Sequence, residues 1–264
     1  MDSRQRMLTS FYGEGGEETR LERNRHGQLE YRTTMAYISR YAVPGCRVLE
    51  IGAGTGRYSV ALAKLGYQVT AVELVEGNLK VLRQNARGLS NLTALQGDAL
   101  DLSRFADASF DLVLLLGPMY HLYERADVHR ALDEAIRVTR PGGVLLTAFL
   151  SVYAVLHNNY LTPALPDGLA ENFTPDWQVR HFEQQLFTGY DVVEFEQLFR
   201  GKPVTHLTTA AANGMLELAE DRLDFSMSDE HFELFCRYHF ATCEKRELLG
   251  ASGHLLHICR RECT

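Results

Sequence analysis

The stretch "VLEIGAGTGRYS", residues 48–59, places three glycines within five positions directly behind an apolar run. The apolar run is typical of a buried strand, and helical spacing resumes behind the glycines at Val60, Leu62 and Leu65. Glycine allows a tight turn and has no Cβ, so the backbone can approach a ligand closely. Amide groups at the start of the following helix suit an anionic group. The stretch therefore predicts a strand–turn–helix unit that binds a nucleotide-like ligand.

Short apolar segments alternate with helical segments from this unit onward. The expected strands are 46–51, 68–74, 92–98, 110–117 and 144–150, and the expected helices between them are 56–66, 78–88 and 124–140. Strands that alternate with helices imply right-handed βαβ units and a parallel sheet. We therefore expect a doubly wound, mainly parallel α/β sheet of Rossmann-like type.

The remaining sequence frames this core. A helix is expected from about Leu29, behind a glycine-rich, acidic joint at 13–18. Residues 151–190 are too long for a plain connection in a compact domain, so they indicate a lid or substrate-binding insertion. A helix at 191–201, a strand at 203–211, a helix near 228–243 and a last strand at 254–260 follow. The predicted divisions are an N-terminal helical flap (1–42), the core (43–150), an α-rich insertion after the fifth strand (151–202) and a C-terminal completion of the sheet with an inserted helix (203–264).

Composition narrows the class of partner. Lys and Arg number 27 and Asp and Glu 34, which gives a net charge of −7, whereas nucleic-acid affinity is built from basic residues. A nucleic-acid partner is therefore not expected. No run of the roughly 20 apolar residues that a membrane span needs occurs, and the first residues lack the apolar region of a signal peptide. Five cysteines without a CxxC pair fit reduced thiols. We expect a soluble cytoplasmic protein of undetermined oligomeric state.

The spacing of the glycines and two carboxylates decide which ligand is expected. The dinucleotide fingerprint G-x-G-x-x-G needs a glycine at position 57, but that residue is Arg57 and the third glycine is Gly56. Glu73 ends the second strand, where a carboxylate can bind ribose hydroxyls of either NAD or S-adenosylmethionine. Asp98, just past the third strand, is placed to accept from an adenine amino group. The pattern favours S-adenosylmethionine.

Five ordered segments carry a resemblance to a known family. They are "VLEIGAGTGRYS", "VTAVEL", "LQGDALDL", "FDLVLLLG" and "AIRVTRPGGVLLTAF", which cover about residues 46–150. In order and spacing this set resembles the class I S-adenosylmethionine-dependent methyltransferases. The segments "LLLGPMYHLY", "YHFATCEKRELLG" and "GHLLHICRR" look like a bacterial subgroup whose substrates the sequence does not identify.

The resemblance implies a set of cofactor-binding residues. Gly52, Gly54 and Gly56 would line the methionine part of the cofactor, and Glu50 would face its amino group. Glu73 would bind the ribose, Asp98 the adenine amino group, and the amide of Ala99 the ring. Backbone carbonyls near Leu115 and Leu116 would complete the amino-acid pocket, and Ala53 and Leu74 belong to the same set.

The acceptor site is expected at "LGPMYHLYE", beyond the fourth strand. His121 is the candidate general base or substrate orienter, because its ordinary pKa suits proton transfer near neutrality, and Tyr120 is the second candidate. The alternative for His121 is a packed side chain that bonds a backbone carbonyl. "GPMY" also resembles the N/D-P-P-Y element of enzymes that methylate nucleic-acid amines. Gly117 and Met119 depart from that element, and the acidic charge argues against it.

Two further groups of residues have alternative interpretations. Aromatic residues at 173–199 either shape an apolar acceptor pocket or form the core of the insertion, the second being about twice as common. His254 and His257 lie three apart in an expected strand and so point to opposite faces. No cluster has metal-ligand spacing, so no metal is expected.

The sequence thus predicts methyl transfer from S-adenosylmethionine to a small molecule by in-line displacement. One alternative is a non-catalytic protein that binds the cofactor or a partner, and a less favoured one is an NAD-dependent oxidoreductase. The identity of the acceptor and of its accepting atom stays open.

Overall fold

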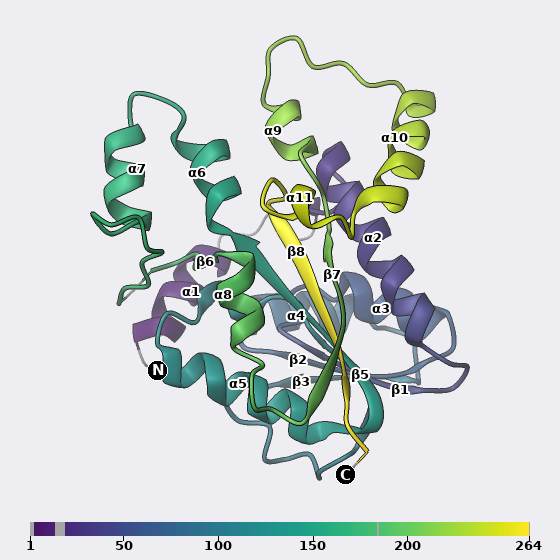
Figure 1. Cartoon of the computed structure of the whole chain (residues 1–264). Helices are drawn as coiled ribbons and strands as arrows, with labels where there is room; N and C mark the ends of the chain where they lie inside the picture. Colours follow the sequence, from purple (N-terminus) through teal and green to yellow (C-terminus); the bar gives the residue numbers. More distant parts are fainter. Residues whose placement is uncertain (1–2, 14–18, 184, 264) are drawn as a thin grey trace.

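A computed structural model describes residues 3–13, 19–183 and 185–263, and within them it contains one eight-stranded sheet flanked by helices (Figure 1). The expected joint at 13–18 lies outside the described residues except for Gly13. The strands are β1 (Arg47–Ile51), β2 (Gln68–Glu73), β3 (Leu92–Gln96), β4 (Phe110–Leu115), β5 (Thr139–Ser151), β6 (Gly189–Tyr190), β7 (Val204–Ala211) and β8 (His254–Arg261).

The helices before and within the core are α1 (Ser3–Gly13), α2 (Arg25–Tyr41), α3 (Arg57–Lys64), α4 (Glu76–Asn85), the 3₁₀-helix η2 (Pro118–His121) and α5 (Arg125–Val138). Those that follow β5 are α6 (Val152–Tyr160), α7 (Leu165–Asn172), α8 (Val192–Gln197), α9 (Leu216–Glu220), α10 (Asp229–Thr242) and α11 (Arg246–Leu249). None of the described helices is both long and apolar enough to cross a membrane.

The strand order is β3-β2-β1-β4-β5-β8-β7, with β6 paired to β5. All pairs are parallel except those of β8 with β5 and β7. The expected doubly wound, mainly parallel sheet is confirmed. After β3 the chain returns to the opposite side of β1, so β1 and β4 are neighbours. Ligands of such sheets bind at this reversal, beyond the carboxyl ends of the strands.

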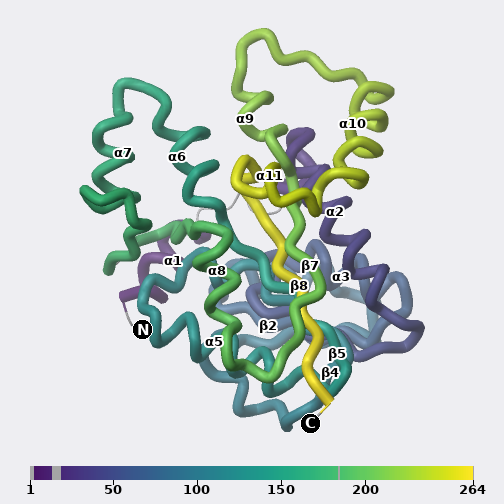
Figure 2. Tube along the Cα trace, viewed as in Figure 1, coloured from purple at the N-terminus to yellow at the C-terminus, as the bar shows by residue number. Residues whose placement is uncertain are grey.

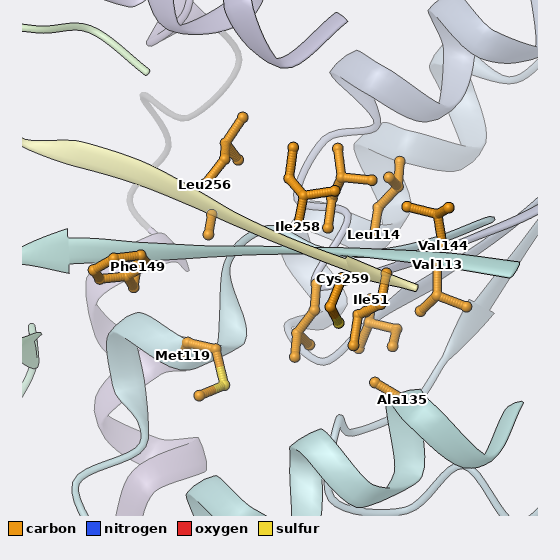
Figure 3. Close-up of a cluster of buried hydrophobic side chains, with 14 of the residues drawn as sticks. Ile51, Val113, Leu114, Met119, Ala135, Val144, Phe149, Leu256, Ile258 and Cys259 are labelled. Carbon is orange, nitrogen blue, oxygen red and sulfur yellow. The ribbon is translucent and has the colours of Figure 1, made fainter. Parts of the chain in front are cut away.

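The core follows from strands that are apolar on both faces. Leu112, Val113, Leu114 and Leu115 of β4 are fully or almost fully buried, as expected for a central parallel strand covered by helices on each face. Figure 3 shows Val113 and Leu114 packed among Val144, Ile258 and other apolar side chains. Helix α5 faces the sheet with a stripe at helical spacing, formed by Val128, Ala131, Leu132, Ala135 and Ile136.

The start of α2, the start of β5 and the presence of α1 are the main differences from the expected elements. Helix α2 begins at Arg25 rather than near Leu29, because Asn24 caps it with its side-chain oxygen 2.9 Å from the amide of Gly27. Strand β5 begins at Thr139 rather than at 144, since Thr139 pairs with Phe110 across a register shift in β4. Helix α1 was not expected from the sequence. In Figures 1 and 2 it lies on the same side of the molecule as α6 and α7, while α2 lies beside α10 on the other.

Gly56 offers a stability test of the packing between α3 and α4. Its φ is +88°, and a Cβ there would lie 2.0 Å from Cδ1 of the buried Leu82. We expect Gly56→Ala to lower the free energy of unfolding by about 2–4 kcal/mol, through left-handed strain and overpacking. Denaturant unfolding measures the change. The control Gly77→Ala, in α4 with open space around its Cβ position, is expected to be neutral or stabilising.

Candidate functional site

A cavity of about 890 Å³ lies at the reversal point of the sheet. Its floor is formed by residues at the ends of β1 to β4, and α1, η2 and the segment around Phe187 contribute to its walls. Ligand pockets span roughly 300–1,000 Å³, so this cavity has room for a nucleoside-sized cofactor and a second small molecule. It places the side chains expected from the sequence around one space.

The glycine turn brings backbone close to this space. Gly52 has a φ of +74°, and a Cβ there would lie 2.5 Å from Cδ of Pro118. The turn after β1 and the turn after β4 therefore pack closely only because position 52 has no side chain. Gly54 lines the cavity beside it, with a φ of +55°.

Glu73 is held in place by the turn that it faces. It is buried at the end of β2, where its Oε2 accepts from the amide of Gly54 and its Oε1 from that of Val75, both at 2.8 Å. These two bonds fix the orientation of the carboxylate at the strand end. Glu73 is thus both a support of the glycine turn and part of the cavity wall.

Glu50 is a buried acid at the end of β1. Its exposed fraction is 1%, and Ser59 of α3 donates a hydrogen bond to Oε2. Burial raises the pKa of Glu50 to about 8, helped by the charge of Glu73 and opposed by hydrogen bonds from Ser59. At neutral pH this carboxyl group is therefore mostly protonated.

Asp98 lies past the end of β3 and contacts the N-terminal helix. Its Oδ2 accepts from the guanidinium of Arg4 in α1, and its Oδ1 accepts from the amide of Leu100 at 3.1 Å. Arg4 is 7% exposed, so this is a largely buried ion pair. Helix α1 therefore covers the part of the cavity where an adenine amino group was expected.

The hydrogen bonds of His121, the last residue of η2, determine which of its ring nitrogens carries the proton. Its Nδ1 lies 2.6 Å from the backbone oxygen of Leu186, which can only accept, so Nδ1 carries the proton. Nε2 is then an acceptor, and the hydroxyl of Tyr12 in α1 donates to it at 2.9 Å. Burial lowers the pKa of His121 to about 4, opposed by the bond to Leu186 and helped by the charge of Arg4. The ring is neutral at physiological pH.

Tyr120 is a second buried polar group of the cavity wall. It is 7% exposed, and among the described residues its hydroxyl has no hydrogen-bond partner. Burial raises the pKa of the Tyr120 hydroxyl well above its ordinary value, and the negative charge of Glu30 is the second cause. A neutral hydroxyl without a protein partner is available to a ligand. The backbone oxygen of Tyr120 accepts from the amide of Thr188 at 2.6 Å, which fixes η2 against the insertion.

Most cofactor-binding residues predicted from the sequence line this one cavity, but two do not. Among the described residues the lining includes Glu50, Gly52, Ala53, Gly54, Glu73, Leu74, Asp98, Ala99, Leu116, Tyr120 and His121. Leu115 is fully buried in β4, and Gly56 is constrained by Leu82 rather than by the cavity. Sequence reasoning did not predict Arg4, Arg20, Asn78 or His254 as lining residues.

The aromatic residues of the insertion divide between the two interpretations. Phe187 lines the cavity, with its ring 5.3 Å from that of His121. Phe195 is fully buried and stacks on Phe149, whereas Trp177 is 67% exposed. His254 lines the cavity and His257 packs on Phe199. No group of three or more metal-ligating side chains occurs within the described residues.

With this geometry established, comparison with known proteins identifies the core. A family model described as "Methyltransferase domain" matches residues 49–147. Residues 49–147 are therefore similar to a methyltransferase domain. This match implies S-adenosylmethionine as methyl donor, and the ends of β1, β2 and β4 that line the cavity lie within the matched residues.

Two bacterial relatives match the same part of the chain. A demethylmenaquinone methyltransferase of Renibacterium salmoninarum is 38% identical over 130 residues, 47% of this chain and 52% of the relative. A ubiquinone biosynthesis O-methyltransferase of Xanthomonas campestris is 32% identical over 137 residues, 49% of this chain and 56% of the relative. The matches thus span about half the length of these curated relatives.

Solved structures agree on the fold. A methyltransferase of Methanosarcina mazei superposes with a TM-score of 0.56 at 18% identity, covering 86% of this chain and 98% of that one. A protein of Pyrococcus horikoshii gives 0.60 at 17% identity, covering 96% and 99%. At such identities the likeness concerns the arrangement of helices and strands.

Proposed function

We propose that this protein transfers a methyl group from S-adenosylmethionine to a small-molecule acceptor. The observation that carries the proposal is the convergence of Glu50, Glu73 and Asp98, from three neighbouring strand ends, on one cavity with the glycine turn. One relative is named for demethylmenaquinone and the other for ubiquinone biosynthesis. From these names we propose for this chain only that the methyl acceptor is a small molecule.

The residues present suit the cofactor. Glu73, oriented by two amides, would accept from the ribose hydroxyls. Asp98 would accept from the adenine amino group once Arg4 releases it, and Ala99 adjoins the ring. Gly52 and Gly54 would let the backbone approach the methionine part. When bound, the sulfonium group supplies an electrophilic methyl for displacement by the acceptor.

The acceptor would lie between η2 and α1, where the cavity wall is mainly apolar and aromatic. In-line displacement depends mostly on distance and alignment of the reacting atoms. Tyr120 would orient the acceptor through its unpaired hydroxyl. His121, neutral and with Nε2 as acceptor, would receive a proton that the reacting atom loses, since its Nδ1–H stays on Leu186.

Labelled S-adenosylmethionine tests the proposal. The protein is incubated with methyl-labelled cofactor and a small-molecule extract, and methylated products are identified by mass spectrometry. We expect a labelled small molecule that requires the protein and is absent with Glu73→Ala. Binding of the cofactor without any labelled product would favour the alternative of a non-catalytic cofactor-binding protein.

Glu50 gives the proposed binding a pH dependence. With a pKa of about 8, this carboxyl must lose a proton to face the cationic amino group of the cofactor. The cost falls as pH rises toward 8, so affinity for S-adenosylhomocysteine should increase from pH 6.5 to 8 and then level off. Calorimetry at pH 7 in buffers of different ionisation enthalpy should show proton release. Glu50→Gln should remove both the pH dependence and the proton release. Proton release of the same size in that variant would show that another group loses the proton.

A further inference from the structure

We propose that Tyr12, on the N-terminal helix α1, is a catalytic residue that relays the acceptor's proton to His121. This inference rests on the proposed methyl transfer and adds a group from outside the methyltransferase domain. It follows from the direction of two hydrogen bonds and from the position of Tyr12 in the cavity wall.

The hydrogen bonds form a chain with a fixed direction. Leu186 accepts from Nδ1 of His121, which leaves Nε2 as the only acceptor of the ring. Tyr12 donates to Nε2 at 2.9 Å. Because the tyrosine hydroxyl donates to the basic nitrogen, a proton from an acceptor in the cavity would reach Nε2 by way of the Tyr12 oxygen. Both Tyr12 and His121 line the cavity.

Aromatic packing holds this pair in position. Tyr12 meets His121 edge to face at 5.6 Å between ring centroids, and Phe187 lies 5.3 Å from both His121 and Phe11. Phe11 and Tyr12 come from α1, Phe187 from the insertion and His121 from η2. Three segments far apart in the sequence therefore hold the proposed relay in position.

The step balances in atoms and charge. The reacting O–H or S–H of the acceptor gives its proton to the Tyr12 oxygen as the tyrosine's own proton moves to Nε2 of His121. The bond from the methyl carbon to the acceptor atom forms as its bond to sulfur breaks, and that electron pair stays on sulfur. One positive charge disappears at the sulfonium while one appears on the imidazole, so the buried cavity keeps the same net charge.

The relay restricts the class of acceptor. The relay contributes to the reaction only when the reacting atom of the acceptor carries a proton. A weakly basic imidazole matches an acidic proton best, and burial keeps the pKa of His121 low. An aromatic or enolic hydroxyl, or a thiol, fits this requirement and the aromatic wall better than an aliphatic hydroxyl.

Tyr12→Phe tests the relay because it removes the hydroxyl and keeps the ring. We expect the rate of label transfer in the extract assay to fall about 100-fold, with affinity for S-adenosylhomocysteine within twofold of the wild type. The double variant with His121→Gln should be no slower than either single variant, because the two groups act as one unit. Tyr41→Phe, at the end of α2 and away from the cavity, serves as the control.

An NMR titration of His121 gives a readout that needs no acceptor. The Tyr12 hydroxyl stabilises the neutral ring by donating to it, so Tyr12→Phe should raise the pKa of His121, and Tyr41→Phe should leave it unchanged. An unchanged His121 titration, or label transfer that is undiminished in Tyr12→Phe, would overturn the relay alone. Absence of any labelled product with the wild-type protein would overturn the proposed function and the relay with it.

Discussion

Glu73→Ala is expected to weaken binding of S-adenosylmethionine at least 100-fold. Hydrogen bonds to a charged carboxylate each contribute about 1.5–3 kcal/mol, and losing two to the ribose corresponds to at least two factors of ten in affinity. The amides of Gly54 and Val75 also lose their acceptor, which loosens the glycine turn. Isothermal titration with S-adenosylhomocysteine measures the change.

Two variants make this result specific. Glu73→Gln retains one carbonyl oxygen and should fall between wild type and alanine. Glu76→Ala removes an exposed carboxylate at the start of α4 that pairs only loosely with Arg83, at 3.7 Å, and should bind as the wild type does. An unaltered affinity in Glu73→Ala would show that this residue does not face the ribose.

His121→Gln is expected to lower turnover about 10²–10³-fold, the range of general-base catalysis, while cofactor affinity changes by less than twofold. Glutamine can still pack in η2 but cannot take up a proton near neutral pH. Initial rates of label transfer, with titration calorimetry for binding, separate the two effects. His129→Gln, a half-buried histidine on α5 outside the cavity, is the control. Equal losses of binding and turnover would instead indicate that His121 only supports the cavity wall.

The core could be predicted from the sequence because its signals are local. Each strand from β1 to β4 is a short apolar run ended by turn residues, and the strand ends carry the polar groups that meet in one cavity. Strand β5 was less regular. Pro141 and Gly142 are typical breakers, yet the pairing of Thr139 with Phe110 of β4 extends the strand back to Thr139. Tertiary pairing thus overrode local preference.

Helix α1 could not be predicted because tertiary contacts hold it. Its buried side chains are Arg4 and Leu8, so it has no continuous apolar stripe. The ion pair of Arg4 with Asp98 and the bond of Tyr12 to His121 connect positions 94 and 109 residues apart. Sequence spacing contains no signal for such contacts. His121 was interpreted either as a general base or as a packed side chain that bonds a backbone carbonyl. In the structure Nδ1 bonds the carbonyl of Leu186, and Nε2 accepts from Tyr12.

The glycine at position 56 has a structural reason that differs from the one inferred from the sequence. Its position, one residue earlier than a dinucleotide fingerprint requires, favoured S-adenosylmethionine over NAD. In the structure the lack of a side chain there is required by Leu82 of α4. The choice of cofactor therefore rests on Asp98 and the methyltransferase domain match rather than on Gly56.

Thermal unfolding in the presence of each candidate cofactor tests the central claim most directly. S-adenosylmethionine and S-adenosylhomocysteine at about 100 times their dissociation constants should stabilise the protein by about 2.7 kcal/mol, seen as a rise in Tm. NAD at the same concentration should leave Tm unchanged. Stabilisation by NAD with no response to either S-adenosyl compound would contradict the account.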